Sequence, residues 1–213
     1  MNLLIATHNP GKLAEYRELL RDLPVELTSL LEQGMQFEPE ETSPTFEANA
    51  VLKATAFAGL SGLPTLADDS GLEIDALNGA PGVHSARYGG TGRGEDARRI
   101  QLVLSQLADV PWPRRTARFR CVVALAAPGR PVQTAHGSVE GIIGREPQGE
   151  HGFGYDPIFF LPGYNCTMAQ LPTRTKNRIS HRAVAIRAAL PLIQKLIGDQ
   201  QSAVSTQQSP ADC

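Results

Sequence analysis

The sequence has few cysteines, no strong excess of either charge and no long apolar run. Its three cysteines, Cys121, Cys166 and Cys213, are too few and too scattered for a disulfide framework or a cysteine-rich zinc site. The 20 basic and 22 acidic residues leave a net charge of −2, which gives no support to a general nucleic-acid binder. No apolar run approaches the roughly 20 residues that span a bilayer, and the first residues lack the basic segment of a secretion signal. We therefore expect a cytoplasmic protein with no membrane segment and no nucleic-acid partner.

The chain does have a globular composition and many turn-forming residues. Hydrophobic residues make up 41% and charged residues 20%, which is typical of a chain with a packed core. The 20 glycines and 16 prolines predict many loops, and loops often carry binding and catalytic residues. A length of 213 residues suffices for one sizeable core or for two small lobes around a cleft.

The hydrophobic pattern predicts a mixture of strands and helices, which indicates an α/β protein. Apolar runs predict strands over residues 3–6, 25–30, 65–67 and 158–160, and a hairpin of 117–126 with 132–141. Helices are predicted over 12–23, 45–60, 95–107 and 180–197, the last bent or broken near Pro191. We expect one domain over residues 1–197 and a disordered tail over 198–213.

The segment Thr7-His8-Asn9-Pro10-Gly11-Lys12 lies between the first predicted strand and the first predicted helix. Free backbone N–H groups and the helix dipole favour an anion at such a junction. Thr7, Asn9 and Lys12 would add a hydroxyl, an amide and a cation. The two-glycine frame of a Walker loop is missing, so the segment is either a different anion site or an ordinary turn with an exposed lysine.

Two pairs of acidic residues are candidates for a metal site. The strand over 65–67 is expected to stop at Asp68-Asp69-Ser70-Gly71, and alternation along it lets only one of the two aspartates face a given cleft. Glu40-Glu41, in a predicted loop, could add a carboxylate. Oxygen ligands of this kind suit Mg²⁺, which keeps several of its waters. An Asp-rich turn and a solvated acidic loop are the structural alternatives.

Two later segments complete the candidates. In Gly152-Phe153-Gly154-Tyr155-Asp156-Pro157, the glycines allow close backbone approach, and the two aromatic rings could stack on a flat base. Lys176 with Ser180-His181-Arg182 places cations and a hydroxyl near a helix start, which suits phosphate or a carbonyl-bearing base. A surface loop anchored by aromatics and a solvated helix face are the alternatives.

In this order, the segments resemble the inosine triphosphate pyrophosphatase family, the non-canonical purine nucleoside triphosphate pyrophosphatases. The matching blocks span positions 7–182 and are Thr7 to Lys12, Glu41 with Thr45-Phe46 and Asn49-Ala50, Leu66 to Leu72, Gly79 to Gly82 with Ser85 to Tyr88, Gly152 to Pro157, and Lys176 with Ser180 to Arg182. The sequence departs from the family at Ala48, where many relatives carry Glu, and at His84, where relatives often carry Tyr or another residue. Glu41 and Asp69 of the acidic site remain.

The resemblance implies an elongated, strongly curved mixed β-sheet flanked by helices, with two lobes around a central cleft. It implies a homodimer that needs Mg²⁺ and cleaves ITP, dITP and XTP to the monophosphate and pyrophosphate, removing deaminated purines from the nucleotide pool. Glu41 and Asp69 would hold the metal, and Asp69 would accept the proton of the attacking water. The substrate would contact Thr7, His8, Asn9, Pro10, Gly11, Lys12, Ser70, Phe153, Gly154, Tyr155, Asp156, Lys176, His181 and Arg182.

Base choice follows from hydrogen-bond chemistry under this hypothesis. Inosine and xanthine carry a carbonyl at position 6, where adenine carries an amino group. His181 or Arg182, as donors, would pair with the carbonyl and oppose the amino group, and Phe153 or Tyr155 would stack on the ring. Which of ITP, dITP and XTP is preferred stays open.

Two other functions stay open at this point. The first is a non-catalytic nucleotide- or RNA-binding module that uses the same turns and the basic stretch over 114–120. The paired acids Glu41 and Asp69 favour the enzyme, because binding an anion does not need them. The basic stretch is interpreted as a loop entering a strand, with Arg118 and Arg120 pointing outward. The second is a pyrophosphatase of related fold with a different base preference.

Overall fold

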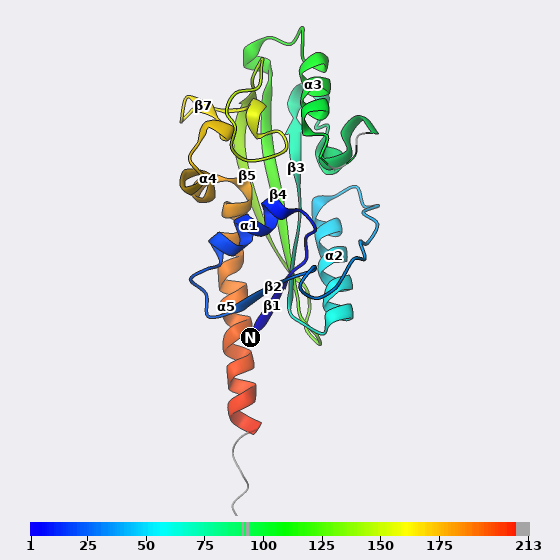
Figure 1. Cartoon of the computed structure of the whole chain (residues 1–213), viewed down its shortest axis with the longest axis vertical. Coiled ribbons are helices and arrows are strands. Elements are labelled where there is room, and N and C mark those ends of the chain that lie inside the picture. Colours follow the sequence, from blue (N-terminus) through cyan, green and yellow to red (C-terminus); the bar gives the residue numbers. More distant parts are fainter. Residues whose placement is uncertain (91, 93, 208–213) are drawn as a thin grey trace, which may run out of the picture.

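The structure, a computed structural model, describes residues 1–90, 92 and 94–207. Within these residues the strands form one seven-stranded sheet in the order β2-β1-β3-β4-β5-β6-β7 (Figure 1). The strands are β1 (Asn2–Ile5), β2 (Glu26–Ser29), β3 (Thr65–Ile74), β4 (Thr116–Ala126), β5 (Gln133–Ile143), β6 (Phe159–Leu161) and β7 (Cys166–Thr167). β1 runs parallel to both β2 and β3, and the other neighbouring strands are antiparallel. The predicted α/β class with a mixed, elongated sheet is confirmed.

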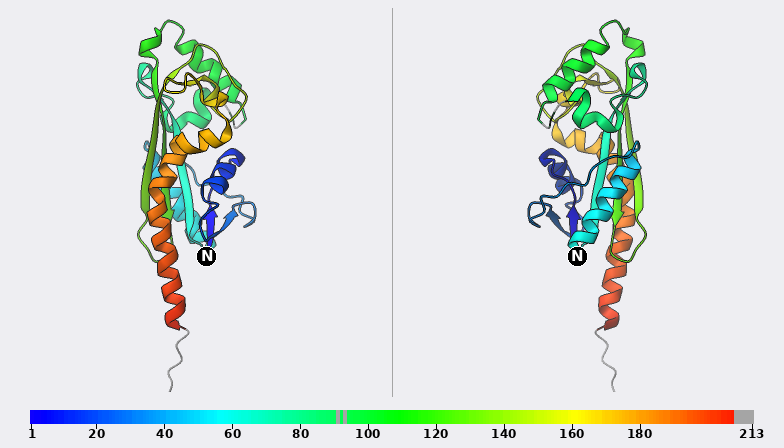
Figure 2. Two further views of the ribbon diagram at one scale, coloured as in Figure 1. Left: turned by 90° about the vertical axis from the view of Figure 1, so that its left-hand side faces the viewer. Right: turned by 90° about the vertical axis from the view of Figure 1, so that its right-hand side faces the viewer.

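Five α-helices surround the sheet in the described part of the chain. They are α1 (Pro10–Leu19), α2 (Phe46–Ser61), α3 (Asp96–Gln106), α4 (Thr173–Ile179) and α5 (His181–Gln207). Short 3₁₀ turns lie at Asp75–Leu77, Gly82–Gly90, Trp112–Arg114, Asp156–Ile158 and Met168–Gln170. The side views show α5 along one face of the long strands and α2 on the other (Figure 2). The predicted hairpin is confirmed as β4 and β5, and Thr45, where the second helix was predicted to begin, is the N-cap of α2.

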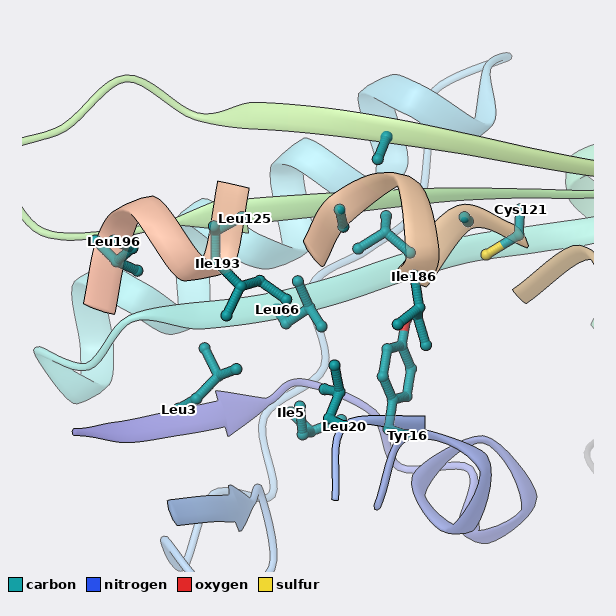
Figure 3. Close-up of a cluster of buried hydrophobic side chains, with 14 of the residues drawn as sticks. Leu3, Ile5, Tyr16, Leu20, Leu66, Cys121, Leu125, Ile186, Ile193 and Leu196 are labelled. Carbon is teal, nitrogen blue, oxygen red and sulfur yellow. The ribbon is translucent and has the colours of Figure 1, made fainter. Parts of the chain in front are cut away.

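Side-chain alternation along β4 explains this two-sided packing. Cys121, Val123 and Leu125 belong to the core under α1 and α5, whereas Val122 and Ala124 belong to the core under α2. Figure 3 shows the first of these cores. A third core joins the far half of the sheet to α3. The sheet therefore has a helix-covered core on each face of its central strands.

The outer side of β4 also matches the sequence prediction. Phe119 and Cys121 are buried, whereas Arg120 is exposed and Arg118 pairs with acidic neighbours. Arg118 lies 3.0 Å from Asp75 and 3.2 Å from Glu140. The basic stretch is thus part of a strand with outward cations.

The prediction that the third strand stops at Asp68 is wrong. β3 continues to Ile74, because β4 offers it a paired residue at every position from Thr65 to Ile74. The cost of placing two carboxylates in a buried strand is offset by cations on each face of the sheet, described below. Alternation sends Asp68 toward α1 and α5, and Asp69 toward α2.

Helix α5 is longer than predicted and continues through Pro191 to Gln207. A proline inside a helix leaves the carbonyl four residues earlier without its N–H partner. Pro191 and Arg187 are both exposed, so water can satisfy that carbonyl, and the expected break does not occur. Residues 198–207 of the predicted disordered tail are helical, and residues 208–213 lie outside the described residues. Across the described chain, no helix is both long and apolar enough to cross a membrane.

Candidate functional site

A cleft of about 820 Å³ lies along the edge of β3 beyond the end of β1. β1 pairs with β3 only at Leu4 and Ile5, so farther along, the edge of β3 faces a loop instead of a strand. All residues predicted for the site line this cleft, namely Thr7, His8, Asn9, Pro10, Gly11, Lys12, Glu41, Asp69, Ser70, Phe153, Gly154, Tyr155, Asp156, Lys176, His181 and Arg182. The structure thus brings the predicted set together, while the role of each residue remains a prediction.

The first wall of the cleft is the turn that leads from β1 into α1. Asn9 caps the helix, since its side chain accepts a hydrogen bond from the Lys12 N–H at 3.1 Å, and Pro10 occupies the first turn. The Thr7 hydroxyl accepts from the Asn9 N–H at 3.2 Å. The His8 ring nitrogen lies 3.0 Å from the Phe37 carbonyl, which ties this turn to the loop before α2. The predicted strand–turn–helix junction is therefore present and faces the cleft.

Two carboxylates, Glu41 and Asp69, converge on one ammonium group. Lys53 Nζ lies 2.8 Å from Glu41 Oε1 and 3.4 Å from Asp69 Oδ1, and Asn49 donates to Asp69 Oδ2 at 3.1 Å. Burial opposes the ionisation of Glu41, but the attraction of Lys53 outweighs it, so the pKa of Glu41 lies below its ordinary value. For Asp69, burial outweighs the attraction of Lys53 and Lys12, and its pKa is raised.

Asp68, on the other face of β3, joins two cations that come from different helices. Its carboxylate accepts from Lys12 Nζ at 2.9 Å and from Arg182 Nη2 at 3.1 Å, and Arg182 also donates to Ser70 Oγ at 2.9 Å. The Asp68 side chain is 0% exposed and that of Arg182 is 1% exposed. Burial alone would raise the pKa of Asp68, but Lys12 and Arg182 hold it well below its usual range. Asp68 is therefore a buried anion.

The buried chain of charges continues from Arg182 to the loop after β5. Arg182 pairs with Glu15 of α1, and Lys176 Nζ lies 2.9 Å from Glu15 and 2.7 Å from Asp156. Burial disfavours the charged form of Lys176, but Asp156 and Glu15 outweigh it and raise its pKa. The Phe153 N–H donates to Asp156 at 3.0 Å. Alternating charges thus link Lys12 to the aromatic loop.

The aromatic loop holds Phe153 at the cleft surface. Gly152 has a φ of +81°, and a Cβ there would lie 2.1 Å from the Asp156 carboxylate, so only glycine fits. The Gly154 N–H donates to Asp96 of α3 at 2.7 Å, which fixes the other side of the loop. Lys176 Nζ lies 4.8 Å from the centre of the Phe153 ring.

Tyr155 and His181, which the sequence indicated as substrate contacts, also pack against other parts of the fold. The Tyr155 hydroxyl donates to the Ser85 carbonyl at 2.9 Å, and its ring is packed in the core under α3. The His181 ring stacks on Phe119 with centres 4.8 Å apart. Burial, reinforced by Arg182 and Lys176, holds the pKa of His181 well below its ordinary value, so the ring is neutral. Among the described atoms, its buried Nδ1 has no hydrogen-bond partner.

Sequence reasoning did not single out Lys53 or Glu15, and it named Asp68 only as one of two adjacent acids of which one would face the cleft. Lys53 follows Asn49 by four residues on α2, so helical spacing places both on one face. That spacing was the available signal for Lys53. Glu15 had no such signal, because its partners come from α4 and α5, more than 160 residues away along the chain.

The fold and the cleft together define an α/β protein with a charged site between two lobes. The chain belongs to the Ham1 family, whose sequence model matches residues 3–192. It is 49% identical over 191 residues to the dITP/XTP pyrophosphatase of Bacillus subtilis (strain 168), an alignment that covers 90% of this chain and 96% of the relative. A dITP/XTP pyrophosphatase of Geobacter sulfurreducens is 48% identical, and the alignment covers 86% of this chain and 92% of the relative. The family predicted from the sequence is confirmed.

Solved structures agree with this assignment. A HAM1 protein from Coxiella burnetii superposes with a TM-score of 0.82 at 45% identity, covering 92% of this chain and 99% of that one. The Ham1 protein of Staphylococcus aureus gives a TM-score of 0.80 at 38% identity, covering 94% and 100%. The likeness therefore extends over nearly the whole of each chain.

Proposed function

We propose that this protein hydrolyses non-canonical purine nucleoside triphosphates, namely ITP, dITP and XTP, to the nucleoside monophosphate and pyrophosphate. The proposal would make it an enzyme that removes deaminated purines from the nucleotide pool. Relatives named dITP/XTP pyrophosphatase, 48–49% identical over most of the chain, support this substrate class.

The observation that carries the proposal is the arrangement of charges in the cleft. The Thr7–Lys12 turn, with its helix N-terminus, stands beside Glu41 and Asp69, which share Lys53. The Phe153 ring lies against the same turn, since a Cβ on Gly11 would be 2.8 Å from a ring carbon. A purine triphosphate combines a polyanion with a flat ring, so this one cleft offers its phosphates the cations and the helix N-terminus, and offers its base an aromatic ring.

The donor set also fits a magnesium ion. The described residues lining the cleft include seven carboxylates and six lysine or arginine side chains, so binding a polyanion requires added positive charge. The described residues hold no group of three or more His, Cys, Asp or Glu side chains suited to a metal. Mg²⁺ is commonly held by one or two carboxylates plus substrate phosphates, which matches Glu41 and Asp69. Ala48 is exposed on α2, and the pair does not depend on it.

The protein residues then divide the chemistry between them. When bound, Mg²⁺ would supply positive charge against the triphosphate. Asp69 would accept the proton of the attacking water, and its raised pKa makes it a better base than an exposed aspartate. Lys12 and the backbone N–H groups of the turn would hold the phosphates in line for attack. Release of pyrophosphate follows from cleavage on either side of the oxygen that bridges the α- and β-phosphorus atoms.

For the base, Phe153 is the stacking residue that the geometry supports, because Tyr155 is committed to Ser85 and to the core. Arg182 is held rigidly by Glu15 and Asp68, and it would donate to the carbonyl at position 6. An amino group at that position, as in ATP, faces a donor and leaves both groups unpaired, which costs affinity.

A nucleotide panel tests the proposal. Pyrophosphate release is measured for ITP, dITP, XTP, GTP and ATP, with and without Mg²⁺, from neutral to mildly alkaline pH. We expect turnover of the first three, little turnover of GTP and ATP, and loss of activity without the metal. Tight ITP binding without pyrophosphate release would favour the non-catalytic binding module instead.

Quaternary structure and location are further parts of the proposal. The family resemblance supports a homodimer in the cytoplasm that does not bind nucleic acid. Light scattering coupled to gel filtration measures the mass of the particle in solution. A mass near that of one chain, 22.9 kDa, would contradict the homodimer.

A further inference from the structure

Lys53 lies where a cation between Glu41 and Asp69 would lie. Its Nζ is 2.8 Å from Glu41 Oε1 and 3.4 Å from Asp69 Oδ1, so it bridges the two carboxylates. The three side chains are 10%, 19% and 7% exposed, respectively, so water screens this contact weakly. The ammonium group already neutralises part of the charge that would attract a divalent ion.

Other donors take up further oxygens of the same two carboxylates. Asn49 donates to Asp69 Oδ2 at 3.1 Å, and Arg87 Nη1 lies 3.5 Å from Glu41 Oε2. Arg87 also donates to the Glu41 carbonyl at 3.0 Å, which holds the acidic loop in this position. A metal ion entering alone must displace these donors and approach a like charge, while giving up some of its own waters.

A triphosphate removes this obstacle because it gives Lys53 another anion. Lys53 and the Thr7–Lys12 turn line the same cleft, so phosphates held by the turn would share that cleft with the Lys53 side chain. Once the ammonium group turns toward phosphate, an oxygen of each carboxylate is released. The substrate also adds its own phosphate oxygens to the coordination shell.

We infer that Lys53 blocks the metal site in the free protein, so that the divalent ion binds only together with the triphosphate. The inference rests on the proposed function. In this scheme Lys53 pairs with the two carboxylates in the free protein and with phosphate once the substrate is bound. The free protein then binds metal alone only weakly.

Binding of Mn²⁺ alone, followed by calorimetry and by electron paramagnetic resonance, tests the inference at fixed pH. Lys53→Gln and Lys53→Met should bind Mn²⁺ at least about tenfold more tightly than the wild type, because a nearby positive charge is gone. Lys53→Arg keeps the charge and should match the wild type within about threefold. Lys195→Gln, on the exposed side of α5, removes one charge far from the cleft and should not change the affinity.

Lys12→Gln separates direct blocking from general cleft charge. Lys12 contacts Asp68 and neither Glu41 nor Asp69, so its loss should tighten Mn²⁺ binding much less than the loss of Lys53. The inference is wrong if Lys53→Gln and Lys53→Met bind Mn²⁺ no better than the wild type, or if Lys12→Gln gains as much as they do.

The wild type gives a reading that does not depend on any variant folding. Millimolar Mn²⁺ alone should leave its melting temperature nearly unchanged, since a ligand that does not bind cannot stabilise. A clear rise overturns the inference. Wild-type pyrophosphate release from ITP with Mg²⁺, measured in parallel, tests the proposed function separately, because blocking in the free protein and turnover of the complex are independent results.

Discussion

Replacing Asp68 by Asn removes the buried anion that joins Lys12 to Arg182. The Asp68 side chain is 0% exposed, and its carboxylate lies 2.9 Å from Lys12 and 3.1 Å from Arg182. Removing one partner of a buried ion pair costs about 3–5 kcal/mol, and the amide oxygen can still accept, so we expect about 3 kcal/mol of lost stability. Urea unfolding followed by circular dichroism should then show a midpoint lower by about 1 M.

A matched exposed pair calibrates this value. Arg130 and Asp199 lie 2.6 Å apart, but their side chains are 40% and 43% exposed. Solvent screening reduces such pairs to about 0.5 kcal/mol or less, so Asp199→Asn should barely move the midpoint. Equal midpoints for the wild type and Asp68→Asn would refute the reasoning, since they would mean that the buried anion contributes nothing.

The pH dependence of Asp68 has a definite sign. Its pKa is lowered in the folded state, so the folded protein binds fewer protons there than the unfolded chain does. The stabilisation of the folded state by the Asp68 carboxylate is therefore complete at a pH well above 3.8, the ordinary pKa of an aspartate. This stabilisation declines as the pH falls below 3.8. The stability difference between wild type and Asp68→Asn should be constant from pH 8 to about pH 5 and shrink in stronger acid. A difference that grows in acid would contradict the assignment.

Two further predictions concern the cleft. Gly152→Ala and Gly154→Ala both place a Cβ at positive φ, +81° and +63°, but only the first meets an atom, at 2.1 Å from Asp156. Steady-state kinetics with ITP should show KM raised by more than about tenfold for Gly152→Ala and by less than about threefold for Gly154→Ala; similar values would contradict the close contact. The lowered pKa of His181, caused first by burial, means that its ring stays neutral, and acidification below its ordinary value of 6.5 favours the unfolded chain. In nuclear magnetic resonance spectra, the His181 ring signal should not titrate between pH 8 and pH 5.5, whereas titration near pH 6.5 would show that the ring is solvated.

Local sequence signals predicted the elements that depend on local chemistry. The helix predicted from residue 45 begins at the Thr45 cap, whose side chain accepts from a backbone N–H three residues away. The helix predicted from residue 12 begins two residues earlier, at Pro10, because Asn9 of the predicted turn caps it in the same way. The hairpin of β4 and β5 follows from two β-rich runs around a Pro-Gly turn. The order of the motifs identified the family, and the cleft gathers every predicted residue.

The parts that could not be predicted depend on contacts made across the chain. Asp68-Asp69 indicates a strand end by propensity, yet pairing with β4 and the cations of three helices keep it inside β3. Pro191 indicates a helix break, yet its exposed position in α5 removes most of the penalty. Glu15 and Asp68 acquire their roles only when α1, β3 and α5 pack together.

The central claim is that Asp69 performs chemistry on a bound triphosphate, and one pair of measurements on Asp69→Asn tests it most directly. Stopped-time assays give pyrophosphate release from ITP with Mg²⁺, and calorimetry gives ITP binding. Catalysis of phosphoryl transfer depends mainly on the placement of charges, so the turnover of Asp69→Asn should fall by at least about 10³-fold while the protein still binds ITP. The control Glu26→Gln, on the exposed edge strand β2, should remain active. Near-normal turnover by Asp69→Asn would contradict the account.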